Sequence, residues 1–112
     1  MPRGGNHSSA HSQLVTDCIT YVSYRGAWVL KIWGNPFMRA GVPDILVCLR
    51  GRFVAIEVKT GKAELGVKQQ DERDKLLAAG ALYILARSLG DLEEALLTAG
   101  LVDAPALTRQ RV

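Results

Sequence analysis

The sequence predicts a single α/β domain in which a mixed β-sheet is flanked by helices, in the order αβββαβα. Three observations lead to this prediction. Two runs rich in β-branched residues lie on either side of a turn at Gly51, as in a β-hairpin. A charged helical segment and another apolar run follow, as in a β-α-β unit. Helical patterns also stand near both ends of the chain, whose 112 residues suffice for one core but not two.

The first helix is expected to begin with Ser12 as its N-cap and to end at Gly26, because apolar residues recur at helical spacing in between. These apolar residues are Leu14, Val15, Cys18, Ile19 and Val22. A strand should follow over residues 27–33, "AWVLKIW", which are rich in aromatic and branched side chains. Residues 34–43 contain two prolines and two glycines and should form a loop.

The hairpin strands are predicted over residues 44–50 and 53–59. A charged helix over 67–80 should end at Gly80, a buried strand should cover 81–86, and a last helix over 88–100 has Asp91 near its start. We expect residues 13–100 to form the domain, residues 1–12 to be a flexible lead-in and residues 101–112 to be a polar tail.

The composition, with 48% hydrophobic and 22% charged residues, is that of a globular protein. No apolar run has the roughly 18 to 20 residues needed to cross a bilayer, and the N-terminus lacks the pattern of a signal peptide. Cys18 and Cys48 lie in apolar patterns without zinc-type spacing, so we expect two reduced core thiols and a cytoplasmic setting. The net charge of +3 combines a basic region over 31–68 with an acidic one over 69–94. This favours an anionic partner on one side, although an ordinary solvated surface would give the same pattern.

The hairpin places charged residues where a core would be expected. Glu57 and Lys59 alternate with Val58 and therefore share one face of the second strand. With a turn centred near Gly51, Asp44 should lie opposite residue 58 or 59, roughly 5 Å away. Asp44, Glu57 and Lys59 can therefore form one cluster.

Two buried carboxylates close together are costly unless a cation neutralises them. Mg²⁺ is usually held by one or two carboxylates together with water and substrate phosphate, and it generates a nucleophilic water near neutral pH. Lys59 could then stabilise developing negative charge or orient the water. The alternative is a surface ion pair on a half-exposed hairpin. It is less favoured because Phe53 and Ala55 make the charged face apolar as well, and a sheet that is apolar on both faces should be covered on both.

These segments carry a resemblance to a known family. "GVPD" at 41–44, "EVKTGK" at 57–62 and a glutamine before "LLAAGA" resemble the PD-(D/E)XK nuclease superfamily. Within it, the chain looks most like the small VRR-NUC domains of bacteriophages and DNA-repair enzymes. The resemblance covers residues 13–97 and implies a restriction-endonuclease-like core.

The resemblance also implies roles for individual residues. Asp44, Glu57 and Val58 would bind Mg²⁺ or Mn²⁺, and Lys59 would be the catalytic lysine. A glutamine on the following helix contributes to such sites. Gln69 and Gln70 both qualify, and the spacing to Leu76 and Gly80 favours Gln69.

One position departs from the family pattern. Relatives usually carry a glutamate on the first helix, where this chain offers only Gln13 and Asp17. Either could support the metal site; an ordinary surface role is the alternative.

The same resemblance implies a homodimer that acts on branched DNA such as four-way junctions, in a bacterial or phage-infected cell. Arg39, Lys62 and Lys68 flank the predicted site and could contact backbone phosphates. Trp33 and Phe37, in or beside the proline-containing loop, could contact DNA or a partner chain, or could belong to the core.

Three functional hypotheses remain open from the sequence. The first is a metal-dependent DNA endonuclease, acting on junctions or instead on duplex, single-stranded or flap substrates. The second is a non-catalytic nucleic-acid-binding module on a nuclease-like scaffold. The third is an assembly subunit whose acidic helix docks a partner.

Overall fold

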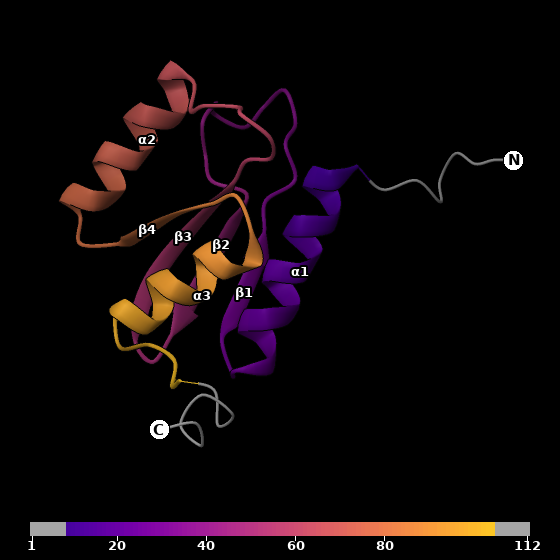
Figure 1. Ribbon diagram of the computed structural model, residues 1–112. Coiled ribbons are helices and arrows are strands. Elements are labelled where there is room, and N and C mark those ends of the chain that lie inside the picture. The colour runs from indigo at the N-terminus through magenta and orange to yellow at the C-terminus, as the bar shows by residue number, and fades with distance from the viewer. Residues whose placement is uncertain (1–8, 105–112) are drawn as a thin grey trace, which may run out of the picture.

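The computed structural model describes residues 9–104 and contains three helices and four strands (Figure 1). In chain order these are α1 (Ala10–Tyr24), β1 (Trp28–Lys31), β2 (Ile45–Leu49), β3 (Arg52–Val58), α2 (Val67–Ala78), β4 (Leu82–Ala86) and α3 (Leu89–Thr98). The predicted order αβββαβα and the mixed α/β class are therefore confirmed. Within the described residues, no helix is long and apolar enough to cross a membrane.

The four strands form one sheet in the order β1-β2-β3-β4. The first three strands are antiparallel, whereas β4 runs parallel to β3 after the crossover through α2. Leu49 pairs with Arg52, so the hairpin turn consists of Arg50 and Gly51 alone. Both have positive φ, 51° and 78°, as a type I′ turn requires.

This turn corrects the expected register by one or two residues. Ile45 pairs with Ile56, so continuing the ladder by one residue sets Asp44 opposite Glu57 rather than opposite residue 58 or 59. The turn is centred between residues 50 and 51, not on Gly51, which shifts the pairing. Asp44 and Glu57 consequently lie on the same face of the sheet.

Helices α1 and α3 cover one face of the sheet and enclose the core (Figure 1). The core is built from residues that lie on one side of each strand and one stripe of each helix: Val15, Cys18, Val22, Ile45, Val47, Val54, Ile56, Val58, Ile84, Leu92 and Leu96. Each is at most 3% exposed. Helix α2 lies apart from these two helices, beside β4 (Figure 1), and buries only a charged residue, Glu72.

Helix α1 starts earlier than expected. Ser9, not Ser12, is its N-cap, because the Ser9 hydroxyl accepts a hydrogen bond from the Ser12 N–H. The helix therefore begins inside the segment predicted as a lead-in. At the other end, Leu101 and Val102 are buried in the core, just beyond the predicted domain. The rest of the predicted lead-in and tail, residues 1–8 and 105–112, lies outside the described residues.

The second face of the sheet is only partly covered, contrary to expectation. Ala55 and Glu57 are buried there, but Trp28 is 59%, Leu30 45% and Phe53 42% exposed. The cross-strand pairing of Trp28 with Cys48, and of Cys48 with Phe53, places all three on this face. Cys48 is accordingly exposed, so the prediction that both cysteines are core thiols is correct for Cys18 and wrong for Cys48.

Candidate active site

Asp44 is held in place from two sides at the start of β2. Its carbonyl oxygen accepts a hydrogen bond of 2.8 Å from the Ile32 N–H, which extends the β1–β2 ladder by one residue. Its carboxylate Oδ2 accepts a second bond of 2.8 Å from the Val58 N–H on β3. A charge-assisted bond to a fixed main-chain amide leaves this carboxylate little freedom. The Asp44 side chain is 26% exposed, so it can still be reached by a ligand.

Glu57 lies near the end of β3 and is 3% exposed. Its Oε2 accepts a hydrogen bond of 2.9 Å from the Gln69 side-chain amide and lies 3.9 Å from the Lys59 ammonium nitrogen. Its Oε1 is buried and has no hydrogen-bond partner among the described residues. A buried carboxylate oxygen without a partner costs on the order of 1–3 kcal/mol or more. The site therefore lacks one cationic or hydrogen-bonding ligand at this atom.

The electrostatic setting of Glu57 points the same way. Burial raises its pKa from the usual 4.5 to about 7, the negative charge of Asp44 contributes to the increase, and Lys59 opposes it. At neutral pH the Glu57 carboxyl is thus divided between its protonated and ionised forms. A cation beside Glu57 and Asp44 would favour the ionised form.

Lys59 and Gln69 complete the surroundings of Glu57. Lys59 directly follows β3, its main-chain N–H donates to the Ala86 carbonyl, and its side chain is 18% exposed. Gln69 lies in the first turn of α2, and its Oε1 accepts a hydrogen bond of 2.9 Å from the Gly66 N–H. This bond fixes the side-chain amide so that the NH₂ group faces Glu57.

Of the two candidate glutamines, the structure brings Gln69 to the cluster and directs Gln70 elsewhere. The Gln70 side-chain amide donates to the Leu65 carbonyl at 3.0 Å and so closes the start of α2. The sequence preference for Gln69 agrees with this geometry.

Gly41 connects the loop before Asp44 with the start of α2. It has a φ of +91°, and a Cβ atom at this position would overlap the main-chain carbonyl of Lys68. Only glycine permits this close approach. The Asp44 loop and the Gln69 turn are thereby held against each other on either side of Glu57.

Gln13 and Asp17, the predicted substitutes for a first-helix glutamate, bind each other instead. The Gln13 amide donates to Asp17 Oδ1 at 3.0 Å, and no contact with Asp44 or Glu57 is found for either within residues 9–104. The helix reaches the site through His11, whose Nε2 lies 3.5 Å from Asp44 Oδ2.

Sequence reasoning missed His11, although a signal was present. Val15, Cys18 and Val22 form the buried stripe of α1. Continuing that stripe by four residues toward the N-terminus leads to His11. The expected start at Ser12 left this residue outside the helix.

The predicted phosphate-binding residues lie around the site with different degrees of freedom. Lys62 and Lys68 are exposed. Arg39 forms an ion pair of 2.9 Å with the buried Glu72 of α2, while its own side chain stays 72% exposed. Arg39 therefore has a structural partner and a solvent-facing surface at once.

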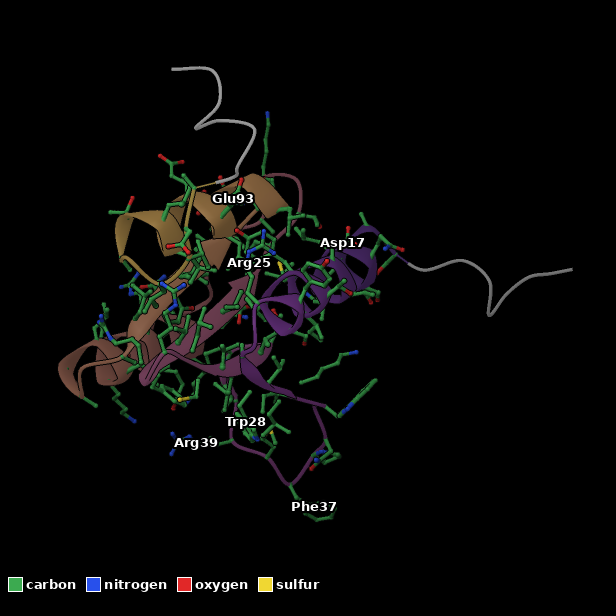
Figure 2. All side chains as sticks on the ribbon, turned by 90° about the horizontal axis from the view of Figure 1, so that it is seen from below. Asp17, Arg25, Trp28, Phe37, Arg39 and Glu93 are labelled. Atoms are coloured by element: carbon green, nitrogen blue, oxygen red, sulfur yellow. The ribbon has the colours of Figure 1, made fainter. Side chains whose placement is uncertain are left out.

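The loop before Asp44 surrounds a pocket of about 300 Å³ that reaches Asp44. Residues 32, 34–35 and 38–44 line it. Trp33 and Phe37, expected to contact DNA or a partner or to enter the core, are 71% and 98% exposed. Figure 2 shows Phe37, Trp28 and Arg39 on the side of the ribbon away from α3 and Glu93.

The donor set at this site fits a hard divalent cation in part. Asp44 and Glu57 are oxygen donors from neighbouring strands, and the unpartnered Oε1 of Glu57 offers a position for such an ion. Val58 could add only its main-chain carbonyl. The described residues include no set of three or more His, Cys, Asp or Glu side chains arranged to hold a metal ion. Water or substrate oxygens would have to complete the coordination, as is usual for Mg²⁺.

Comparison with known proteins identifies the fold. No protein-family model and no curated protein sequence matches the chain. Among solved structures, a VRR_NUC domain superposes with a TM-score of 0.69 and 22% identity, over 81% of this chain and 97% of that one. Hjc from Archaeoglobus fulgidus, a Holliday junction resolvase of an archaeal hyperthermophile, superposes with a TM-score of 0.54 and 20% identity, over 68% and 66%. The predicted resemblance to PD-(D/E)XK nucleases, and to VRR-NUC domains in particular, is confirmed at the level of the fold.

Proposed function

We propose that this protein is a metal-dependent DNA endonuclease. The observation that carries the proposal is the Glu57 carboxylate, which is buried beside Asp44 with one oxygen lacking a partner. A purely structural glutamate would have both oxygens satisfied. The nuclease-type fold gives the cluster a context in which two carboxylates and a lysine have a known chemical use.

Each residue of the cluster has a task that follows from its position. Asp44 and Glu57, with the Val58 carbonyl, would hold Mg²⁺ or Mn²⁺. The ion would supply charge neutralisation at a phosphoryl oxygen and a water of lowered pKa. Lys59 brings a positive charge beside Glu57, where it can stabilise the charge that develops on the phosphate. Gln69 keeps Glu57 oriented while its other oxygen is engaged.

The proposed substrate is branched DNA, in particular a four-way junction. Support comes from the similarity to a Holliday junction resolvase and from Arg39, Lys62 and Lys68 around the site. The loop pocket beside Asp44 offers room for a bent strand. Among the described residues, nothing has the form of a base-reading helix in a zinc finger, so contacts should follow the backbone and its shape.

The proposed active form is a homodimer, because a junction presents two equivalent strands to be cut. A two-fold symmetric enzyme would match this geometry. The open face of the sheet, with Trp28, Leu30 and Phe53, is the proposed contact with the second copy. These side chains are apolar and therefore unsuited to a polyanion. The basic residues around the site would remain free for DNA.

The test uses supercoiled plasmid, linear duplex and a synthetic four-way junction, each with EDTA, Mg²⁺ or Mn²⁺. We expect metal-dependent cleavage with preference for the junction. Asp44→Ala and Lys59→Ala should abolish cleavage and keep junction binding, while Lys75→Ala on the far end of α2 serves as a matched control. Cleavage by either site variant at the parental rate would refute the assignment.

A second function, DNA binding without cleavage, is favoured by one observation. The first helix contributes no carboxylate to the site, since Gln13 and Asp17 bind each other. This hypothesis predicts junction binding by the pure protein with no nicking in either metal. The same assay therefore separates the two functions.

A further inference from the structure

His11 stands out as a chemically active side chain that the proposed cluster does not include. It lies in the first turn of α1, 44% exposed, with its Nε2 facing Asp44 Oδ2 at 3.5 Å. This distance exceeds the 2.7–3.2 Å typical of an N–H···O hydrogen bond. The two atoms therefore face each other without a close direct bond.

A separation of this size suits two ligands of one ion. Donor atoms at about 2.1 Å from a metal lie roughly 3.0 Å apart at a right angle and roughly 3.4 Å apart at a tetrahedral angle. The nitrogen of His11 and the oxygen of Asp44 are close to this range. Only a small movement would let both bind the same cation.

An orienting role alone does not explain the contact. Asp44 is already fixed by the Val58 N–H at 2.8 Å, a shorter bond than anything His11 supplies. A second observation points to a ligand at the same place, because Glu57 Oε1 is buried without a partner. Three donors thus come from three separate segments: the first turn of α1, the start of β2 and the end of β3.

We propose that His11 is a metal ligand contributed by the first helix, and that it biases the site toward Mn²⁺ over Mg²⁺. This inference rests on the proposed function, in that Asp44 and Glu57 must bind a cation at all. Imidazole nitrogen is a softer donor that suits transition metals, whereas Mg²⁺ prefers oxygen ligands. His11 thereby occupies the role for which Gln13 and Asp17 were the sequence candidates.

The test measures metal binding directly, by calorimetric titration of the purified full-length chain with MnCl₂ and with MgCl₂. His11→Ala should weaken Mn²⁺ binding by about tenfold or more and Mg²⁺ binding by clearly less. His11→Glu should strengthen Mg²⁺ binding relative to Mn²⁺ and so lower the ratio of the two affinities. Asp17→Asn is the matched control on the same helix and should change neither affinity. Circular dichroism verifies that every variant is folded.

The outcomes separate this inference from the proposed function. Binding and Mn²⁺-dependent cleavage by the parent, with an unchanged affinity ratio in His11→Ala and His11→Glu, would overturn the role of His11 alone. Equal weakening of both metals in His11→Ala would also overturn it, because that result indicates only an effect on Asp44. If the parent binds neither metal and does not cut, the proposed function fails together with the inference.

Discussion

Replacing Glu57 by glutamine should stabilise the metal-free protein at alkaline pH. In the folded protein the pKa of Glu57 is raised from 4.5 to about 7, first by burial and then by the charge of Asp44. Between these values the folded state binds more protons than the unfolded state. The free energy of unfolding therefore falls as the pH rises through this interval and levels off above it.

The magnitude follows from the size of the pKa increase. A difference from 4.5 to about 7 corresponds to on the order of 3 kcal/mol at full ionisation. Glu57 is 3% exposed, so solvent screening reduces this little. Glutamine carries no charge at any of these pH values, and its side-chain oxygen can still accept from the Gln69 amide. Glu57→Gln should thus avoid most of the loss.

The assay is urea denaturation followed by circular dichroism, with EDTA, at pH 5 and pH 8.5. The parent should lose on the order of 3 kcal/mol between the two conditions, and Glu57→Gln clearly less. Glu94→Gln, at an exposed position of α3, is the control and should follow the parent. Mg²⁺ or Mn²⁺ at pH 8.5 should restore stability to the parent but not to Glu57→Gln. Parallel losses in parent and Glu57→Gln would refute the reasoning.

Three further predictions concern the surroundings of the site. Gly41→Ala should lower the free energy of unfolding by about 2 kcal/mol or more, because of its positive φ and the overlap with the Lys68 carbonyl, as urea denaturation would reveal. Gln69→Ala should reduce junction cleavage by about tenfold or more while Gln70→Ala retains it, and equal rates for the two would contradict the geometry. Trp28→Glu should convert the proposed dimer to a monomer in light scattering without unfolding it, since the side chain is 59% exposed; an unchanged mass would count against this face as the interface.

The hairpin and its charged residues could be predicted because strand alternation is a strict rule. Asp44 reached the face of Glu57 although the register was misplaced, since the structure puts it opposite residue 57 and the prediction included residue 59. Both are odd-numbered and point the same way. The detail that failed was the turn, where Arg50 adopts the positive φ more often found at glycine or asparagine.

The contribution of the first helix could not be predicted because two serines compete as its N-cap. Ser9 and Ser12 are chemically equal candidates, and only the position of the helix on the sheet decides between them. That choice moves the start by three residues and brings His11 into the first turn. In the same way, the exposure of Cys48 follows from an uncovered sheet face, which no local pattern announces.

The two-residue turn of Arg50 and Gly51 has a consequence at the far end of the hairpin. Because the ladder from Leu49–Arg52 to Ile45–Ile56 is unbroken, the turn acts as the gauge that meets Asp44 with Glu57. One added residue in the turn that slipped this ladder by one position would oppose Asp44 to a side chain of the other face. Length variation in a solvent-exposed loop would then dismantle chemistry some five residue pairs away, while insertions in the loop before Gly41 would not count in this register.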